Sequence, residues 1–209
     1  FKMTEDGNFE EVTDPEEGQR FATDFLRYYP RRVSLAPNEA QTVRVQLTKT
    51  SALEQGEYRS HVYFRAIEDE SALGMETEEE SEGISIQIKT VFGISIPVII
   101  RHGESTTGLS IEDLELQREG ETPQLSMRLH RQGNMSVYGN IQVLHIASNG
   151  TATEVGLVKG ISVYTPNGIR EFTLPLYNSP AVDLSRGKLK VTYTSESGEV
   201  LAVHEMQVN

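Results

Sequence analysis

The chain has no cysteine and no tryptophan among its 209 residues. The absence of cysteine excludes disulfides, thiolate metal sites and cysteine nucleophiles, but it does not fix the compartment, because exported proteins also fold without disulfides. Long apolar runs are missing too, since no stretch of 18 or more apolar residues occurs and no basic start precedes an apolar segment. We therefore expect no membrane insertion, and no signal peptide within this sequence.

Positive charge is scarce. Only 19 Lys and Arg residues stand against 31 Asp and Glu residues, which gives a formal net charge of -12. This excess repels phosphate backbones and anionic lipid head groups, so we expect no nucleic acid partner. The acidic stretch from Glu68 to Gly83 predicts a solvated loop. The alternative is a divalent cation site, although the stretch lacks the ligand spacing of a calcium loop.

Patterns of catalytic residues are also absent. No serine lies in a Gly-x-Ser-x-Gly turn, and no pair of carboxylates stands out from the general acidity. The histidines, at positions 61, 102, 130, 145 and 204, have no metal-ligand spacing. The sequence therefore predicts a protein that is not an enzyme and has neither a metal site nor a cofactor.

Short alternating segments separated by turn residues recur along the whole chain, which is typical of an all-β protein. Asp6-Gly7 lies between two short apolar segments and predicts a tight hairpin, because glycine supplies the positive φ that such a turn requires. Further strands of the first half are expected at Phe25 to Ser34, Ala40 to Leu47, Glu57 to Ile67 and, as one long strand, Ile84 to Arg101.

A polar stretch with two glycines, His102 to Gly108, predicts a linker between two domains. Seven strands are expected after it, at Leu109 to Gln117, Gln124 to Arg131, Ser136 to Ile146, Glu154 to Tyr164, Ile169 to Leu176, Lys188 to Thr194 and Glu199 to Val208. Seven strands in about 100 residues are typical of an immunoglobulin-like sandwich. We therefore expect two such domains in tandem, residues 1–103 and 104–209. The first lacks its opening strands by this count, so we expect the native protein to continue upstream of Phe1.

One segment carries an unusually long row of apolar side chains at alternate positions: Ile84, Ile86, Ile88, Phe92, Ile94, Ile96, Val98 and Ile100. Successive side chains of a strand point to opposite faces, so this row lies on one face. Burial of such side chains contributes roughly 1.5–3 kcal/mol each. The row must therefore fill either the core of this protein or that of a partner.

Three stretches of the first half resemble the periplasmic chaperones of the chaperone-usher pilus pathway, whose fold is two immunoglobulin-like domains. The first runs from Tyr29 to Val45 and contains a Pro-Asn turn followed by a Gln-x-apolar-Arg strand. The second is Glu57-Tyr58-Arg59-Ser60-His61-Val62-Tyr63-Phe64. The third is the long alternating strand, which falls where the family has the strand that it lends to a pilus subunit.

The resemblance implies a periplasmic, non-enzymatic protein that caps a pilus or fimbrial subunit and delivers it to an outer-membrane usher. The residues that it assigns to subunit binding are Ile94, Ile96, Val98, Ile100 and Phe92. Family members also anchor the subunit's terminal carboxylate with two basic residues. The segment from Gly93 to Val98 is uncharged, which leaves the flanking Lys89 and Arg101 as the candidates.

Other functions stay open at this point. The long strand also fits a structural or adhesive tandem of a cell-surface protein, in which the strand is internal, or an accessory β-domain of a carbohydrate-processing enzyme. An exposed edge would equally allow a homodimer. A basic aromatic cluster is either a contact surface or a solvated strand face. It comprises Arg27, Tyr28, Tyr29, Arg31 and Arg32.

Overall fold

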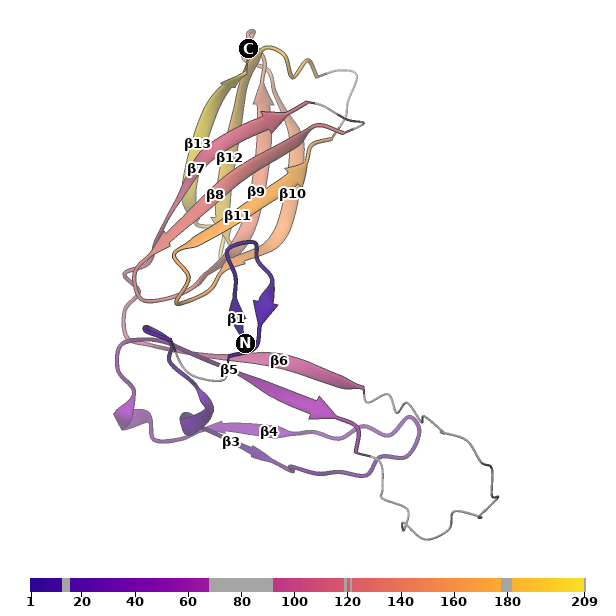
Figure 1. Cartoon of the computed structure of the whole chain (residues 1–209), viewed down its shortest axis with the longest axis vertical. Helices are drawn as coiled ribbons and strands as arrows, with labels where there is room; N and C mark the ends of the chain where they lie inside the picture. Colours follow the sequence, from indigo (N-terminus) through magenta and orange to yellow (C-terminus); the bar gives the residue numbers. More distant parts are fainter. Residues whose placement is uncertain (13–15, 68–91, 119, 121, 178–181, 209) are drawn as a thin grey trace, which may run out of the picture.

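The computed structural model describes residues 1–12, 16–67, 92–118, 120, 122–177 and 182–208. These residues form an all-β fold, with two short 3-10 helices at Thr23–Phe25 and Thr50–Ala52 and no α-helix in the described part of the chain. None of its helices is long and apolar enough to cross a membrane. Two arms meet at an angle, an N-terminal half and a C-terminal sandwich (Figure 1).

The N-terminal half consists of three two-stranded sheets, each antiparallel: β1 with β2, β3 with β4, and β5 with β6. Their bounds are β1 Lys2–Met3, β2 Phe9–Glu10, β3 Leu26–Tyr29, β4 Arg44–Leu47, β5 Gly56–Arg65 and β6 Gly93–His102. The β1-β2 hairpin turns at Gly7, whose φ of 85° is the left-handed conformation expected from the Asp6-Gly7 pair. The hairpin lies in the corner between the two arms (Figure 1).

The C-terminal sandwich contains seven strands in two sheets, in the orders β11-β8-β7 and β10-β9-β12-β13. Their bounds are β7 Gly108–Gln117, β8 Gln124–Gln132, β9 Val137–Ile146, β10 Ala152–Val163, β11 Ile169–Pro175, β12 Gly187–Ser195 and β13 Val200–Val208. Each of the seven expected strands is present. The alternating apolar pattern located them because every strand buries one face.

The two sheets of the sandwich enclose one large apolar core. Leu125 and Leu129 of β8 and Ile141 and Val143 of β9 have no exposed surface. The buried Tyr193 of β12 donates a hydrogen bond from its hydroxyl to the carbonyl oxygen of Ile161, 2.5 Å away. Burial raises the pKa of this phenol, so it stays protonated as a donor.

The N-terminal half has a much smaller core. Its buried apolar cluster consists of Ala22, Tyr58 and Ile100, against which Phe25, Leu26 and Leu53 are partly buried. Toward the other end of the arm, apolar side chains of β3, β4 and β6 are exposed, among them Tyr28, Val45 and Ile94. The described strands of this half therefore leave much of their own apolar surface in solvent.

Three expectations for the first half are altered. The strand expected from Ala40 to Leu47 is β4, which begins only at Arg44. The strand expected from Phe25 to Ser34 ends at Tyr29, because Pro30 follows and no residue from 30 to 43 joins a ladder. The long strand is described from Gly93 onward, and its expected first part, Ile84 to Val91, lies outside the described residues.

The size of the sandwich core predicts that Leu129→Ala lowers the free energy of unfolding by about 2–5 kcal/mol, because a cavity replaces a side chain with no exposed surface. Val200→Ala is the control, since Val200 is exposed and its loss should change stability by about 0.5 kcal/mol or less. Urea denaturation followed by far-ultraviolet circular dichroism measures both. Equal effects would contradict this location of the core.

Candidate functional site

Strand β6 has one paired edge and one free edge. It pairs with β5 over all ten of its residues, from Gly93 opposite Arg65 to His102 opposite Gly56. On its other side, no strand of the described residues pairs with it. A free edge presents backbone N–H and C=O groups that can bind a further strand.

The apolar face of β6 changes from exposed to buried along its length. Phe92, just before the strand, is 76% exposed, Ile94 is 66% exposed and Ile96 is 48% exposed. Val98 is half-buried, and Ile100 is only 8% exposed. The residues opposite Ile94 and Ile96 on β5 are Phe64 and Val62, which continue the same apolar face.

Four of the five residues expected to bind a subunit therefore have at least part of their side chain accessible. Ile100 does not, because it packs into the small core with Ala22 and Tyr58. The accessible part of the face consists of Phe92, Ile94 and Ile96, with Val98 at its margin.

Arg101, one of the two expected anchors, already binds a carboxylate of its own chain. Its Nε donates to Glu57 Oε2 at 3.0 Å, and its Nη2 donates to the carbonyl oxygen of Ser136 at 3.1 Å. The Arg101 side chain remains half exposed, with 49% of its surface accessible. Lys89, the other expected anchor, lies outside the described residues.

Glu57 is the centre of the junction between the two arms, and its side chain has no exposed surface. Its Oε2 accepts hydrogen bonds from the Arg101 guanidinium and from the backbone N–H of Ser136, each at 3.0 Å. Its Oε1 accepts from the hydroxyls of Ser136 and Thr165. This role was not predicted from the residue pattern, in which the only available signal was a glutamate at the start of a strand.

Arg59 and His61 occupy the corner of the junction. The Arg59 guanidinium lies 4.0 Å from the centroid of the Tyr164 ring and 5.2 Å from that of Phe9. Burial lowers the pKa of Arg59. Burial, and then the neighbouring Arg59, also lower the pKa of His61 to about 4. His61 is therefore a neutral ring at pH 7.

The β1-β2 hairpin fills the rest of this corner. Asn167 Nδ2 donates to the carbonyl oxygen of Met3, and the N–H of Glu171 on β11 donates to the carbonyl oxygen of Glu5 at 2.7 Å. Phe1 packs edge-on against His61 with ring centroids 5.3 Å apart. The corner is thus packed by this chain's own residues.

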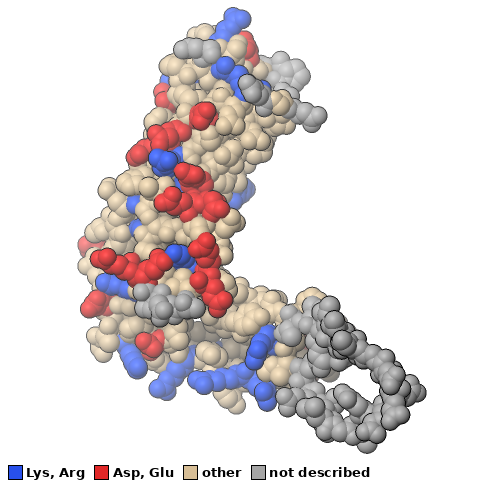
Figure 2. Space-filling view, viewed as in Figure 1, with Lys and Arg blue, Asp and Glu red and all other residues tan. Residues whose placement is uncertain are grey.

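The basic aromatic cluster lies on and next to β3. Its arginines, Arg27, Arg31 and Arg32, are exposed, and the Arg31 guanidinium lies 5.3 Å from the centroid of the Tyr28 ring. Lys and Arg side chains gather along this outer side of the N-terminal half, while Asp and Glu are more frequent on the visible face of the sandwich (Figure 2).

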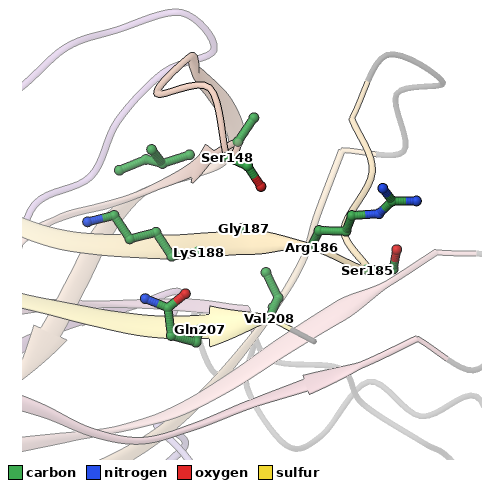
Figure 3. Close-up of a pocket in the computed structure, with 9 residues that line it drawn as sticks. Ser148, Ser185, Arg186, Gly187, Lys188, Gln207 and Val208 are labelled. Atoms are coloured by element: carbon green, nitrogen blue, oxygen red, sulfur yellow. The ribbon is translucent and has the colours of Figure 1, made fainter.

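A shallow hollow of about 480 Å³ lies at the far end of the sandwich, between the end of β9 and the start of β12. Figure 3 shows that the Arg186 and Lys188 side chains at this hollow point away from each other. Each is already paired, Arg186 with Asp183 at 3.2 Å and Lys188 with Glu205 at 2.7 Å. The hollow therefore has no converging charge with which to bind a ligand.

No group of three metal-ligating side chains occurs within the ranges that the structure describes. The acidic stretch weighed above as a loop or a cation site falls almost entirely on residues 68–91, outside those ranges.

No protein-family model and no curated protein matches the chain. Solved structures of beta-glucosidases, among them the following two, show partial similarity. Beta-glucosidase 3B from Thermotoga neapolitana is 17% identical with a TM-score of 0.35, over 52% of this chain and 17% of that one. The GH3 beta-glucosidase of Bifidobacterium adolescentis is 16% identical with a TM-score of 0.32, over 56% and 18%. The chain spans less than a fifth of either, and similarity at this level carries no argument about fold or function.

Glu57→Ala removes the acceptor shared by Ser136, Thr165 and Arg101. We expect it to lower the free energy of unfolding by about 1.5–3 kcal/mol, because a charged acceptor of several hydrogen bonds is lost. The angle between the arms should also vary more, which small-angle X-ray scattering detects as a larger radius of gyration. Glu54→Ala is the control, since Glu54 is exposed in a surface pair with Arg20. An unchanged scattering profile for Glu57→Ala would refute this role.

The low pKa of His61 makes stability depend on pH. The unfolded chain binds a proton near pH 6.5 and the folded chain only near pH 4, so protonation favours unfolding. The contribution of the neutral His61 ring to the free energy of unfolding is fully present above about pH 6.5 and is lost as the pH falls from 6.5 toward 4. A titration of the His61 ring by NMR should give a midpoint near pH 4, and His61→Gln should reduce the acid sensitivity of unfolding. A midpoint near 6.5 would contradict the packing described for this corner.

Proposed function

We propose that the protein is a periplasmic chaperone built from two immunoglobulin-like domains in tandem, residues 1–103 and 104–209. It caps a pilus or surface-fibre subunit by adding strand β6 to the subunit's incomplete sandwich, and it passes the subunit to an outer-membrane usher. Two observations support this function: the sequence resemblance described above, and the free edge and exposed apolar face of β6.

The observation that carries the proposal is the coincidence of a free edge with an exposed apolar face on one strand. Ile94 and Ile96 stand in solvent beside an edge that no described strand covers. In strand addition, backbone hydrogen bonds along the edge give affinity, and alternate side chains that enter pockets of the partner set the register. Both requirements are met over the same residues.

The buried end of β6 supports the same mechanism. Ile100 and Arg101 tie the strand to the rest of the chain through the small core and through Glu57. The outer part of the strand is thereby held extended before any partner binds, which reduces the entropy lost on binding. A subunit would meet a preformed edge.

Anchoring of the subunit's terminal carboxylate is supported by fewer contacts than strand addition is. Arg101 directs Nε and Nη2 to its own chain's Glu57 and Ser136. A subunit's terminal carboxylate would bind the half-exposed remainder of this guanidinium, with Lys89 as the second candidate from the sequence. This part of the proposal is separable from strand addition.

Ile94→Asp and Ile96→Asp each place a charge in what would be an apolar pocket of the subunit, and each should abolish capture. The measurement is co-purification of the protein, after co-expression, with candidate fibre subunits from neighbouring genes. Val203→Asp on β13 is a matched control, because Val203 and Ile96 are both 48% exposed. If both β6 variants still capture a subunit, strand addition by β6 is excluded. If the wild-type protein captures none of the candidate subunits, a structural or adhesive surface module is favoured.

A further inference from the structure

We propose that Pro97 selects the partner of β6: it removes the central hydrogen-bond donor of the free edge, so that the edge accepts a strand of a different polypeptide in preference to β6 of a second copy. The inference rests on the proposed function for the identity of that polypeptide. The hydrogen-bond phase of the β5-β6 ladder decides toward which side the nitrogen of Pro97 points.

One backbone hydrogen bond fixes this phase. The N–H of Ala66 donates to the carbonyl oxygen of Phe92 at 3.1 Å, just beyond the paired residues Arg65 and Gly93. In an antiparallel ladder, hydrogen-bonded and non-hydrogen-bonded pairs alternate. The even-numbered residues of β6 therefore bond to β5, and the odd-numbered residues direct their N–H and C=O groups to the free edge.

A bond on the other side of β5 confirms the phase independently. The N–H of Arg59 donates to the carbonyl oxygen of Arg20 at 2.8 Å, away from β6. Arg59 lies opposite Ile99, which is thus a non-hydrogen-bonded pair, as the alternation requires.

Pro97, which lies opposite His61, is one of the odd-numbered residues whose backbone groups point to the free edge. The donors of the free edge are the N–H groups of Gly93 and Ser95 on one side and those of Ile99 and Arg101 on the other. Proline has no N–H, so the middle of the edge offers only the carbonyl oxygen of Pro97. Since its nitrogen points away from β5, the bonding of β6 to its own chain loses nothing.

The missing donor disfavours a second copy more than a foreign strand. In a symmetric dimer both copies present the same surface, so an antiparallel β6-β6 pair that spans residue 97 contains two prolines. Two acceptor carbonyls are then left without a donor, whatever the register. A foreign strand meets the gap once, and a partner that has a bulge or a solvated carbonyl at that point avoids it.

A second strand carries a proline in the same phase, but at an edge that is partly covered. β11 is at the edge of its sheet, and the N–H of Leu176 donates to the carbonyl oxygen of Pro123, which places Pro175 opposite Gln124 in a non-hydrogen-bonded pair. The nitrogen of Pro175 therefore also points away from its own sheet. β11 lacks the exposed alternating isoleucines of β6, and its outer edge is already bonded on both sides of Pro175, because the N–H groups of Glu171 and Tyr177 donate to the carbonyl oxygens of Glu5 and Val155. Pro175 is therefore the control: an outward-directed proline at an edge that is not free.

The test is the oligomeric state of the full chain, measured by sedimentation velocity over a range of concentrations. Pro97→Thr restores the donor without adding an apolar side chain. We expect the wild-type chain to be monomeric, Pro97→Thr to dimerise with an affinity about tenfold or more above that of the wild type, and Pro175→Thr to behave as the wild type. The double variant Ser95→Pro/Pro97→Thr, which moves the gap by one outward position, should return to monomer.

Dimerisation of the wild type equal to that of Pro97→Thr, or an equal response to Pro175→Thr, would overturn the inference. So would a Pro97→Thr dimer that Ser95→Pro leaves unchanged, because its interface would lie elsewhere. This measurement needs no subunit. If Pro97→Thr dimerises while no candidate subunit is captured, the proposed function fails and the selection against self-pairing stands. If subunits are captured while Pro97→Thr stays monomeric, the proposed function stands and the selection against self-pairing fails.

Discussion

The arrangement of the two arms depends on the buried carboxylate of Glu57. Transfer of an ionised carboxylate out of water costs several kcal/mol unless donors and an opposite charge replace the solvent. Here the donors come from β6, from the residue before β9 and from the segment after β10. All must be in place together, since a partly satisfied carboxylate would be unfavourable. The position of β5 and β6 relative to the sandwich follows from this requirement.

The burial gradient along β6 follows from the same junction. At its junction end the strand is held by Arg101 through Glu57 and by Ile100 in the small core. Away from the junction the described residues of the arm form two-stranded sheets without a comparable core, and Ile94 and Ile96 are exposed. One strand is therefore anchored at one end and accessible at the other, which is the arrangement that a preformed binding edge requires.

Sequence patterns predicted the parts of the fold that depend on local alternation. The seven strands of the sandwich and the Asp6-Gly7 hairpin could be located because each strand buries alternate residues and the turn needs a glycine. Alternation assigns a side chain to a face but not to a depth, so it did not separate the buried Ile100 from the exposed Ile94. Nor could it assign Arg101 to Glu57, because that contact joins residues 44 positions apart in sequence.

A free edge next to exposed isoleucines is a hazard for any soluble protein, because it favours edge-to-edge association. An internal strand needs no protection, since its own sheet covers both edges. On β6 the face opposite the isoleucines carries Ser95 and Pro97, and the proline is placed where its missing donor affects only an added strand. A strand that has an exposed apolar face and lacks the central hydrogen-bond donor of its free edge is consistent with an exposed, partner-binding role. It is harder to reconcile with a strand whose face is covered within its own chain.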